Sequence, residues 1–210
     1  MNAEPRDFNK DAATWDEKPA RVKLAGELFN AIRDKAGLAP SFRVLDYGCA
    51  TGLLTLQIAS HVQSVTGVDA APEMLAVLES KAAALGLTNV AGYQVAEDAM
   101  GSLQGNYDRI ICTMTLHHVE HILPLLKLFW AHLVPGGNVC VADLDLDGGK
   151  FHDNHAGTFH DGFDRTALRH LFEEAGFVNI SVSTAAEIVR PGADGVARTF
   201  TVFLMTGFRV

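Results

Sequence analysis

Short apolar runs alternate with helical patterns along most of the chain. Runs typical of buried strands lie at 42–46, 64–69, 90–95, 107–113 and 138–143. Apolar stripes with helical spacing lie at 20–37, 51–61, 72–82, 119–133 and 164–175. Strand–helix alternation of this kind predicts an α/β sheet with helices on both faces.

The last two apolar runs follow a different pattern. Residues 178–184 alternate and 199–208 form a long apolar run, and only a loop around Pro191-Gly192 separates them. Two runs with no helix between them predict an antiparallel pair. A turn is expected at 135–137, where Pro-Gly-Gly precedes the fifth run. The predicted sheet is therefore mostly parallel and seven-stranded, with an antiparallel C-terminal strand pair.

Composition narrows the class of protein. The chain has 210 residues, 48% of them hydrophobic and 20% charged, which suits one globular domain over 1–210. A net charge of −8 argues against nucleic acid and anionic membranes as partners. Three widely spaced cysteines without a CxxC pattern indicate a reducing compartment. With neither a signal peptide nor a membrane-spanning run in view, we expect a cytoplasmic protein without membrane contact.

The junction between the first strand and its helix contains unusual residues. Asp46, Gly48, Ala50 and Gly52 form the pattern D-x-G-x-A-x-G. Glycine permits tight turns and close approach to a ligand, and the helix N-terminus that follows attracts an anionic group. A dinucleotide site has G-x-G-x-x-G instead, and an acid at the strand end is poorly placed beside a pyrophosphate. The acid suits a ligand that also carries a positive group.

Acidic residues also follow the next two strands. Asp69 ends the second strand, where a carboxylate can accept both hydroxyls of a ribose. Glu97 and Asp98 follow the third strand, where an oxygen can accept from an adenine amino group. A ribose, an adenine and a zwitterionic tail together describe S-adenosyl-L-methionine.

At this point the chain resembles the class I S-adenosylmethionine-dependent methyltransferases. The resemblance is carried by five segments in order, VLDYGCATG at 44–52, VTGVDAAPEML at 65–75, QVAEDA at 94–99, YDRIICTMTLHHV at 107–119 and LVPGGNVCVADLD at 133–145. It implies a Rossmann-like three-layer sandwich with S-adenosyl-L-methionine as cofactor. It also implies that residues 1–37, which include Phe8 and Trp15, form a helical cap over the cofactor cleft.

The resemblance further implies roles for individual residues. Asp46 is expected to hold the amino group of the cofactor, and Gly48, Ala50 and Gly52 to face its methionine end. Asp69, Ala70 and Met74 are expected to lie beside the ribose. Asp98 or Glu97, beside Ala99, is expected to contact the adenine amino group, and Thr113 to line the cofactor from the end of the fourth strand. The main departure is Ala50, where the family usually has glycine.

Candidate catalytic residues follow the fourth and fifth strands. A histidine at the end of the fourth strand can orient or deprotonate an acceptor. We favour His118 over His117, because strand alternation should leave one of them facing the cleft, and we add Asp143. Three alternatives stay open. His117 and His118 could be polar only because they lie where a helix begins, or His117, His121 and a loop residue could form a metal site. Residues 152–160 could be a lid without a chemical role. No metal is expected.

These observations predict an enzyme that moves a methyl group to an O, N or C atom of a small-molecule acceptor. A non-catalytic S-adenosylmethionine-binding sensor or partner subunit is the alternative, because its binding motifs would be identical. A NAD-type dehydrogenase is less favoured because of Asp46. The acceptor and the oligomeric state are not set by the sequence.

Overall fold

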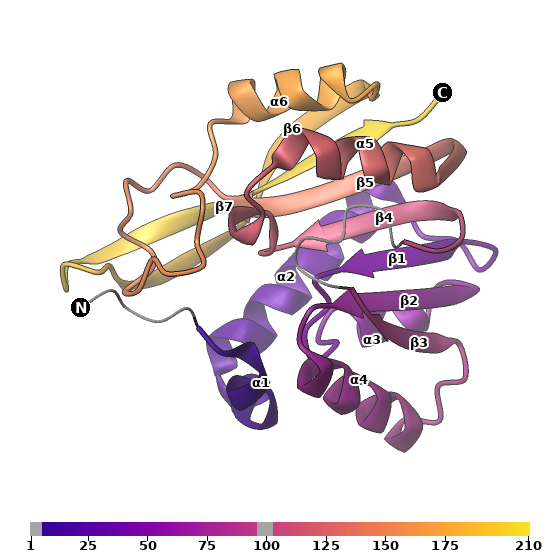
Figure 1. The fold of residues 1–210 in the computed structure, drawn as a ribbon, viewed down its shortest axis with the longest axis horizontal. Helices are drawn as coiled ribbons and strands as arrows, with labels where there is room; N and C mark the ends of the chain where they lie inside the picture. The colour runs from indigo at the N-terminus through magenta and orange to yellow at the C-terminus, as the bar shows by residue number, and fades with distance from the viewer. Residues whose placement is uncertain (1–5, 96–102) are drawn as a thin grey trace.

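A seven-stranded sheet forms the centre of the molecule, and its order is β3-β2-β1-β4-β5-β7-β6 (Figure 1). The computed structural model describes residues 6–95 and 103–210. The strands are β1 (Arg43–Tyr47), β2 (Ser64–Asp69), β3 (Val90–Gln94), β4 (Tyr107–Thr113), β5 (Leu133–Leu144), β6 (Val178–Pro191) and β7 (Ala197–Phe208). Neighbours pair in parallel except at β7, which is antiparallel to β5 and β6. The predicted mixed sheet with an antiparallel C-terminal pair is confirmed.

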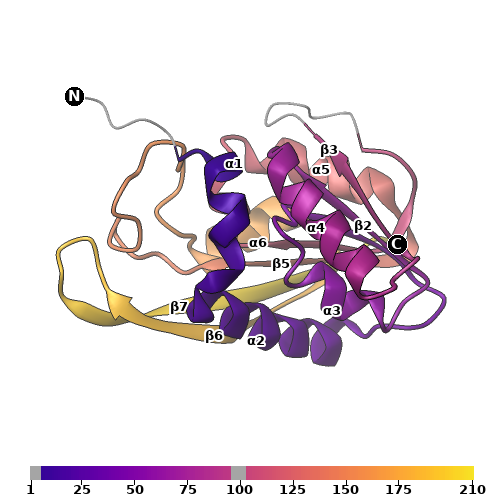
Figure 2. The ribbon, with the colours of Figure 1, turned by 90° about the horizontal axis from the view of Figure 1, so that it is seen from below.

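Helices cover both faces of the sheet (Figures 1 and 2). One face carries α2 (Pro19–Ala36), α3 (Thr55–Ala59) and α4 (Pro72–Ala84), and the other carries α5 (Ile122–His132) and α6 (Arg165–Glu174). The order of strands reverses between β1 and β4, since the chain builds outward from β1 to β3 and then returns beside β1. Sheets of this kind bind ligands at the carboxyl ends of the strands next to that reversal.

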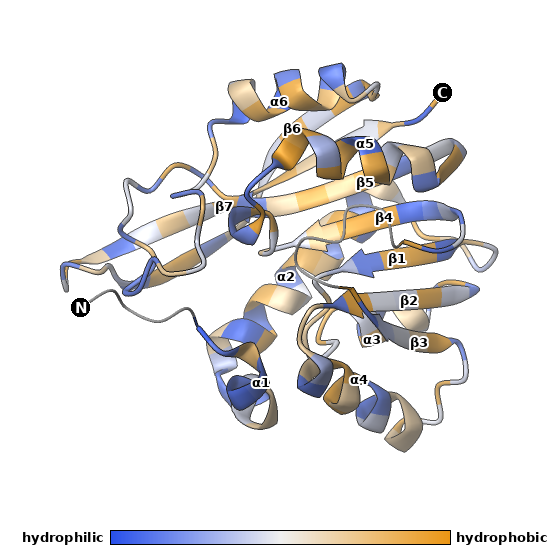
Figure 3. Cartoon of the chain, viewed as in Figure 1, coloured by the Kyte–Doolittle hydropathy of each residue, from blue (hydrophilic) through white to orange (hydrophobic). Residues whose placement is uncertain are grey.

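The core has two halves because successive strand residues point to opposite faces. In β1, Leu45 packs with α5 and α6, whereas Val44 packs with α2 and α3. Ile110 and Ile111 divide in the same way in β4. Burial on both faces explains why these strands appear in the sequence as continuous apolar runs. Figure 3 shows apolar residues along the central strands of the sheet.

The segment before α2 has structure of its own. Helix α1 (Phe8–Asp11) and the 3-10 helix η1 (Ala12–Glu17) lie beside α4 (Figure 2). The Asp7 side chain caps α1 by accepting a hydrogen bond from the Asn9 amide at 3.1 Å. Ala12 is buried with Ala71 and Met74 of the α4 region. The segment is therefore packed onto the rim next to β2.

Several predicted boundaries shift. The turn expected at 135–137 lies within β5, which runs from Leu133 to Leu144, and the pairing of β5 with β4 jumps there from Leu133 to Asn138. Gly136 takes a φ of 78°, and its amide donates to the Arg209 carbonyl, so that this part of the chain remains hydrogen-bonded to the C-terminal end of the protein. The alternating run at 178–184 is only the first half of β6, which continues to Pro191.

Two helices are shorter than the apolar stripes suggested. The stripe at 51–61 gives a helix only over Thr55–Ala59, because the first residues form the turns of the loop. The stripe at 119–133 gives a helix over Ile122–His132, preceded by a 3-10 turn η2 (Leu116–His118). In the described ranges, none of the helices combines the length and apolar character that crossing a membrane requires.

Candidate active site

The carboxyl ends of β1 and β2 lie side by side, with Tyr47 in register with Val68. Asp46 points into the core next to this edge and is 1% exposed. Its Oδ2 accepts a hydrogen bond from the Thr55 hydroxyl at 2.6 Å. Burial raises the pKa of Asp46 to about 6, the hydrogen bond from Thr55 opposes this rise, and the charge of Asp69 adds to it. The site therefore holds a buried carboxylate whose negative charge is poorly compensated.

The loop after β1 needs glycine at two positions. Gly48 has a φ of 75°, and a side chain there would overlap Thr115 in the segment after β4. Gly52 has a φ of 80°, and a side chain there would overlap Leu78 of α4. Glycine therefore lets the loop approach its neighbours closely and leaves its backbone uncovered for a ligand.

Ala50 adopts the left-handed conformation, with a φ of 46°. This conformation costs a residue with a Cβ atom about 1–2 kcal/mol. The amide of Ala50 donates to Oδ2 of Asp69 at 2.8 Å, so the end of β2 holds the strained residue in place. The departure from glycine at position 50 thus acts through the backbone conformation and not only through the size of the methyl group.

Asp69 links the loop to the start of α4. Its Oδ1 accepts from the Ala71 amide at 2.9 Å, while Oδ2 serves Ala50. A carboxylate at this rim is chemically suited to ribose hydroxyls, because each of its oxygens accepts hydrogen bonds. A cavity of about 140 Å³ lies here, lined by Asp69, Ala70, Ala71 and residues 6–9. The residues present therefore fit the sugar of a nucleoside at this place.

Two more predicted cofactor residues lie near the same rim. Met74 is 1% exposed and packs beneath it in a cluster with Phe8, Trp15 and Ala50. Thr113 ends β4, and its carbonyl accepts the Thr115 hydroxyl at 3.0 Å. The predicted adenine contacts Glu97, Asp98 and Ala99 lie outside the described residues.

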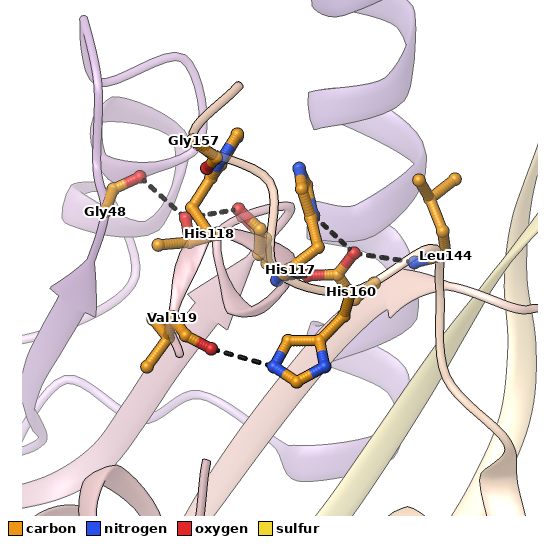
Figure 4. A network of polar contacts seen from close by, with 10 residues as sticks. Gly48, His117, His118, Val119, Leu144, Gly157 and His160 are labelled. Atoms are coloured by element: carbon orange, nitrogen blue, oxygen red, sulfur yellow. Dashed lines mark hydrogen bonds and ion pairs between the residues drawn. The ribbon is translucent and has the colours of Figure 1, made fainter. Parts of the chain in front are cut away.

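His117 and Asp143 form a buried pair at the ends of β4 and β5. The Nδ1 of His117 lies 2.7 Å from Oδ1 of Asp143, and the exposed fractions are 2% and 0%. The backbone amide of His117 also donates to Oδ2 of Asp143 at 3.2 Å. Figure 4 shows His117 beside His118, with Gly48 to the left of the pair and Leu144 to the right. Asp143 therefore fixes the orientation of His117.

His118 is held from two sides. Its Nδ1 lies 2.7 Å from the carbonyl oxygen of Gly157, and a carbonyl only accepts, so Nδ1 carries the proton. In the neutral ring, Nε2 is then left with the lone pair. The Phe8 ring meets the His118 ring edge-on at 5.4 Å. Burial and the neighbouring His117 lower the pKa of His118 below its ordinary value.

The two histidines do not follow strand alternation. They occupy the 3-10 turn η2, where their ring centroids lie only 4.2 Å apart. The chain leaves the extended conformation of β4 at Met114, which has a φ of 53°, and the turn η2 follows. The reason given for choosing between the two rings is therefore wrong, although only His117 is fully buried.

The loop between β5 and α6 brings one histidine to this pair. The His152 ring lies 4.9 Å from that of His117, and its pKa falls to about 4, chiefly through burial. His160 instead donates to the Val119 carbonyl at 2.9 Å, and His155 faces Asp161 at 3.1 Å. Over residues 6–95 and 103–210, no group of three or more histidine, cysteine or acidic side chains is placed to hold a metal ion.

Comparison with known proteins agrees with this architecture. A solved S-adenosylmethionine-dependent methyltransferase from Aquifex aeolicus has the same fold, with a TM-score of 0.70 at 20% identity, over 98% of this chain and all of that one. The fold is thus that of the class I methyltransferases, as the sequence indicated. A family model described as methyltransferase domain matches residues 2–182, and the chain belongs to this family. The expected class, a methyltransferase, is confirmed at the level of the family.

The chain also resembles curated proteins, each over only part of that protein's length. The chain is 26% identical over 176 residues to an uncharacterized methyltransferase of Schizosaccharomyces pombe, covering 75% of this chain and 60% of that protein. It is 28% identical over 147 residues to a ubiquinone biosynthesis O-methyltransferase of Vibrio parahaemolyticus, covering 68% and 63%. The chain therefore spans about three fifths of the length of these relatives.

Some site residues have little or no signal in the sequence. Thr55 is a polar residue at the start of an apolar helix, and this position is the one available clue to its bond with Asp46. Asp16 bonds Thr51 and Lys81 at the loop, although 35 and 65 residues separate them along the chain. Only the folded arrangement identifies Asp16 as part of the site.

Proposed function

We propose that this chain transfers the methyl group of S-adenosyl-L-methionine to an oxygen atom of a small molecule. The observation that carries the proposal is the pair Asp46 and Asp69 on either side of the loop at 48–52, at the carboxyl edge of neighbouring strands. One acid is buried beside the loop and the other borders a cavity. This arrangement suits a ligand with a cationic end and a ribose.

In this proposal the loop receives the methionine end of the cofactor. Asp46 balances its amino group directly or through water, Asp69 and Ala70 border the ribose, and Met74 supports that wall from beneath. The same assignment extends to Gly48, Ala50, Gly52, Thr113, Glu97, Asp98 and Ala99. S-adenosyl-L-methionine supplies an electrophilic methyl on a sulfonium, and its positive charge disappears during transfer.

The acceptor is placed next to the histidine pair. His118 carries a proton on Nδ1, and burial lowers its pKa and so favours the neutral ring, whose Nε2 can take the proton of an acceptor hydroxyl. His117, oriented by Asp143, packs beside it at an interplanar angle of 46° and limits its movement. The printed name of the relative from Vibrio parahaemolyticus, an O-methyltransferase, favours oxygen over nitrogen or carbon.

The segment 1–37 acts as a cap in this proposal. Phe8 borders the cavity next to Asp69 and also contacts His118, so one side chain lies against both proposed subsites. A wall shared in this way excludes water from the site during methyl transfer. The charge of −8 favours a small neutral acceptor over a polyanion.

The test has two arms. Calorimetry with S-adenosylhomocysteine, the demethylated product, measures cofactor binding without an acceptor. Methyl transfer is then assayed against a panel of small phenols, alcohols, amines and carbon acids. Transfer to hydroxyls supports the proposal, binding without turnover favours a sensor or partner subunit, and preference for a dinucleotide contradicts it.

A further inference from the structure

The cofactor loop is held in place by two side chains from outside it, Asp16 and Lys81. Oδ1 of Asp16 accepts a hydrogen bond from the Thr51 hydroxyl at 2.6 Å. Lys81 of α4 donates to Oδ2 of Asp16 at 2.6 Å and to the Thr51 carbonyl at 2.8 Å. Thr51 is completely buried. The hydroxyl and the carbonyl of Thr51 are therefore both hydrogen-bonded to the ion pair of Asp16 and Lys81.

This fastening adjoins the strained position of the loop. Ala50, directly before Thr51, has a φ of 46°, in the region that residues other than glycine avoid. Asp69 holds the Ala50 amide on one side, and Asp16 with Lys81 holds Thr51 on the other. Strained residues persist where surrounding contacts determine their conformation, and they gather at ligand sites.

Asp16 belongs to η1 and so joins the segment before α2 to the loop. Trp15, next to it, packs in one cluster with Ala50 and Met74. The Arg21 guanidinium stacks on the Trp15 ring at 3.5 Å, which holds the indole in place. Movement of η1 would therefore release the Thr51 hydroxyl and the packing over Ala50 together.

We propose that Asp16 is a positioning residue for cofactor binding, which holds the alanine-containing loop in its left-handed form through Thr51 and Lys81. The inference rests on the proposed function, because the loop is taken to receive the methionine end of S-adenosyl-L-methionine. Since Asp16 acts through Ala50, its importance should depend on which residue stands at position 50. Glycine there adopts a positive φ without the steric cost.

The experiment measures the dissociation constant of S-adenosylhomocysteine by calorimetry for the full chain and its variants. Asp16→Ala should weaken binding about tenfold, the scale of one lost charge-assisted hydrogen bond. Asp16→Asn should lose less, because its amide oxygen can still accept from Thr51. Glu17→Gln, a change at the next carboxylate along the chain, should bind as the unmodified chain does.

The deciding arm places Asp16→Ala in an Ala50→Gly background. If Asp16 holds the strained backbone, the loss should shrink to about threefold or less there. In a Trp130→Phe background, Trp15 emission reports on the packing of η1 and should shift with Asp16→Ala. An equal loss in both backgrounds, or unchanged binding by Asp16→Ala, overturns the role of Asp16. Absence of binding by the unmodified chain overturns the proposed function itself.

Discussion

The carboxylate of Asp46 accepts a hydrogen bond from the hydroxyl of Thr55 at 2.6 Å, and both side chains are buried. A single neutral donor compensates little of a buried charge, so the pKa of Asp46 rises to about 6. The pair therefore keeps a carboxylate in a place that costs stability in the absence of a cationic ligand. A cofactor amino group supplies the compensation that the fold itself lacks.

The first prediction concerns pH and the change Asp46→Asn. The folded carboxyl binds its proton more tightly than the unfolded one, whose pKa is near 3.8, so its contribution to stability falls as pH rises between these values. Above the folded pKa the cost is constant. The stability of Asp46→Asn relative to the unmodified chain should therefore improve by about 1 kcal/mol from about pH 5 to about pH 8. Urea denaturation at both pH values measures this difference, and a flat difference contradicts the assigned burial of charge.

Cofactor binding should respond in the opposite sense. A cationic group beside Asp46 favours its ionised form, so binding should release protons and tighten as pH rises through about 6. Asp46→Asn should bind S-adenosylhomocysteine more weakly, by about 1–3 kcal/mol, and lose this pH dependence. Calorimetry in two buffers of different ionisation enthalpy counts the protons released. The same proton release in the asparagine variant would show that another group is responsible.

A third prediction separates Asp69 from other carboxylates at strand ends. Asp69→Ala removes the acceptor of the Ala50 and Ala71 amides and the proposed ribose contact, so cofactor affinity should fall by about 1–3 kcal/mol. Asp108 provides the matched control, because it also accepts from a backbone amide, that of Arg43, but at the start of β4. Asp108→Asn should leave the dissociation constant unchanged. Equal losses in the two variants would indicate a general effect on stability.

Much of this fold follows from the sequence for a physical reason. Strands buried on both faces appear as apolar runs, so β2 and β4 are predicted to the residue, and Asp164 is correctly placed as the cap of α6, where it accepts from two amides. The order of parallel strands then places their carboxyl ends, and with them Asp46 and Asp69, at one rim.

What the sequence does not predict depends on contacts between distant segments. The left-handed turns at Ala50 and Met114 have no signal, because neither residue favours that conformation. The bonds from Asp16 to Thr51 and Lys81 require η1 to lie against α4. The left-handed turn at Met114 comes directly before His117 and His118, so these two residues do not alternate as strand residues would.

A fourth prediction uses two glycines with similar backbones. Gly48 and Gly86 have φ values of 75° and 67°, but a side chain at 48 would overlap Thr115, whereas one at 86 meets nothing within 4 Å. Gly86→Ala should therefore cost only the conformational penalty, about 1–2 kcal/mol of stability. Gly48→Ala should cost about 1–3 kcal/mol more through overpacking, and it should weaken cofactor binding. Chemical denaturation of both variants isolates the steric part, and equal costs would mean that the loop has room to move away from Thr115.

The last prediction tests His118 as the base for the acceptor. His118→Gln keeps a side chain that can donate to the Gly157 carbonyl but removes the basic nitrogen, so kcat should fall about 100-fold while binding of S-adenosylhomocysteine is unchanged. Activity of the unmodified chain should rise with pH with a midpoint below the ordinary histidine pKa of 6.5, because burial lowers the pKa of His118 and only the neutral ring accepts a proton. The glutamine variant should lack this rise. His170→Gln, on the exposed face of α6, serves as the control and should retain both rate and profile. A profile that persists in His118→Gln would assign the titration to a different group, with His117 as the next to test.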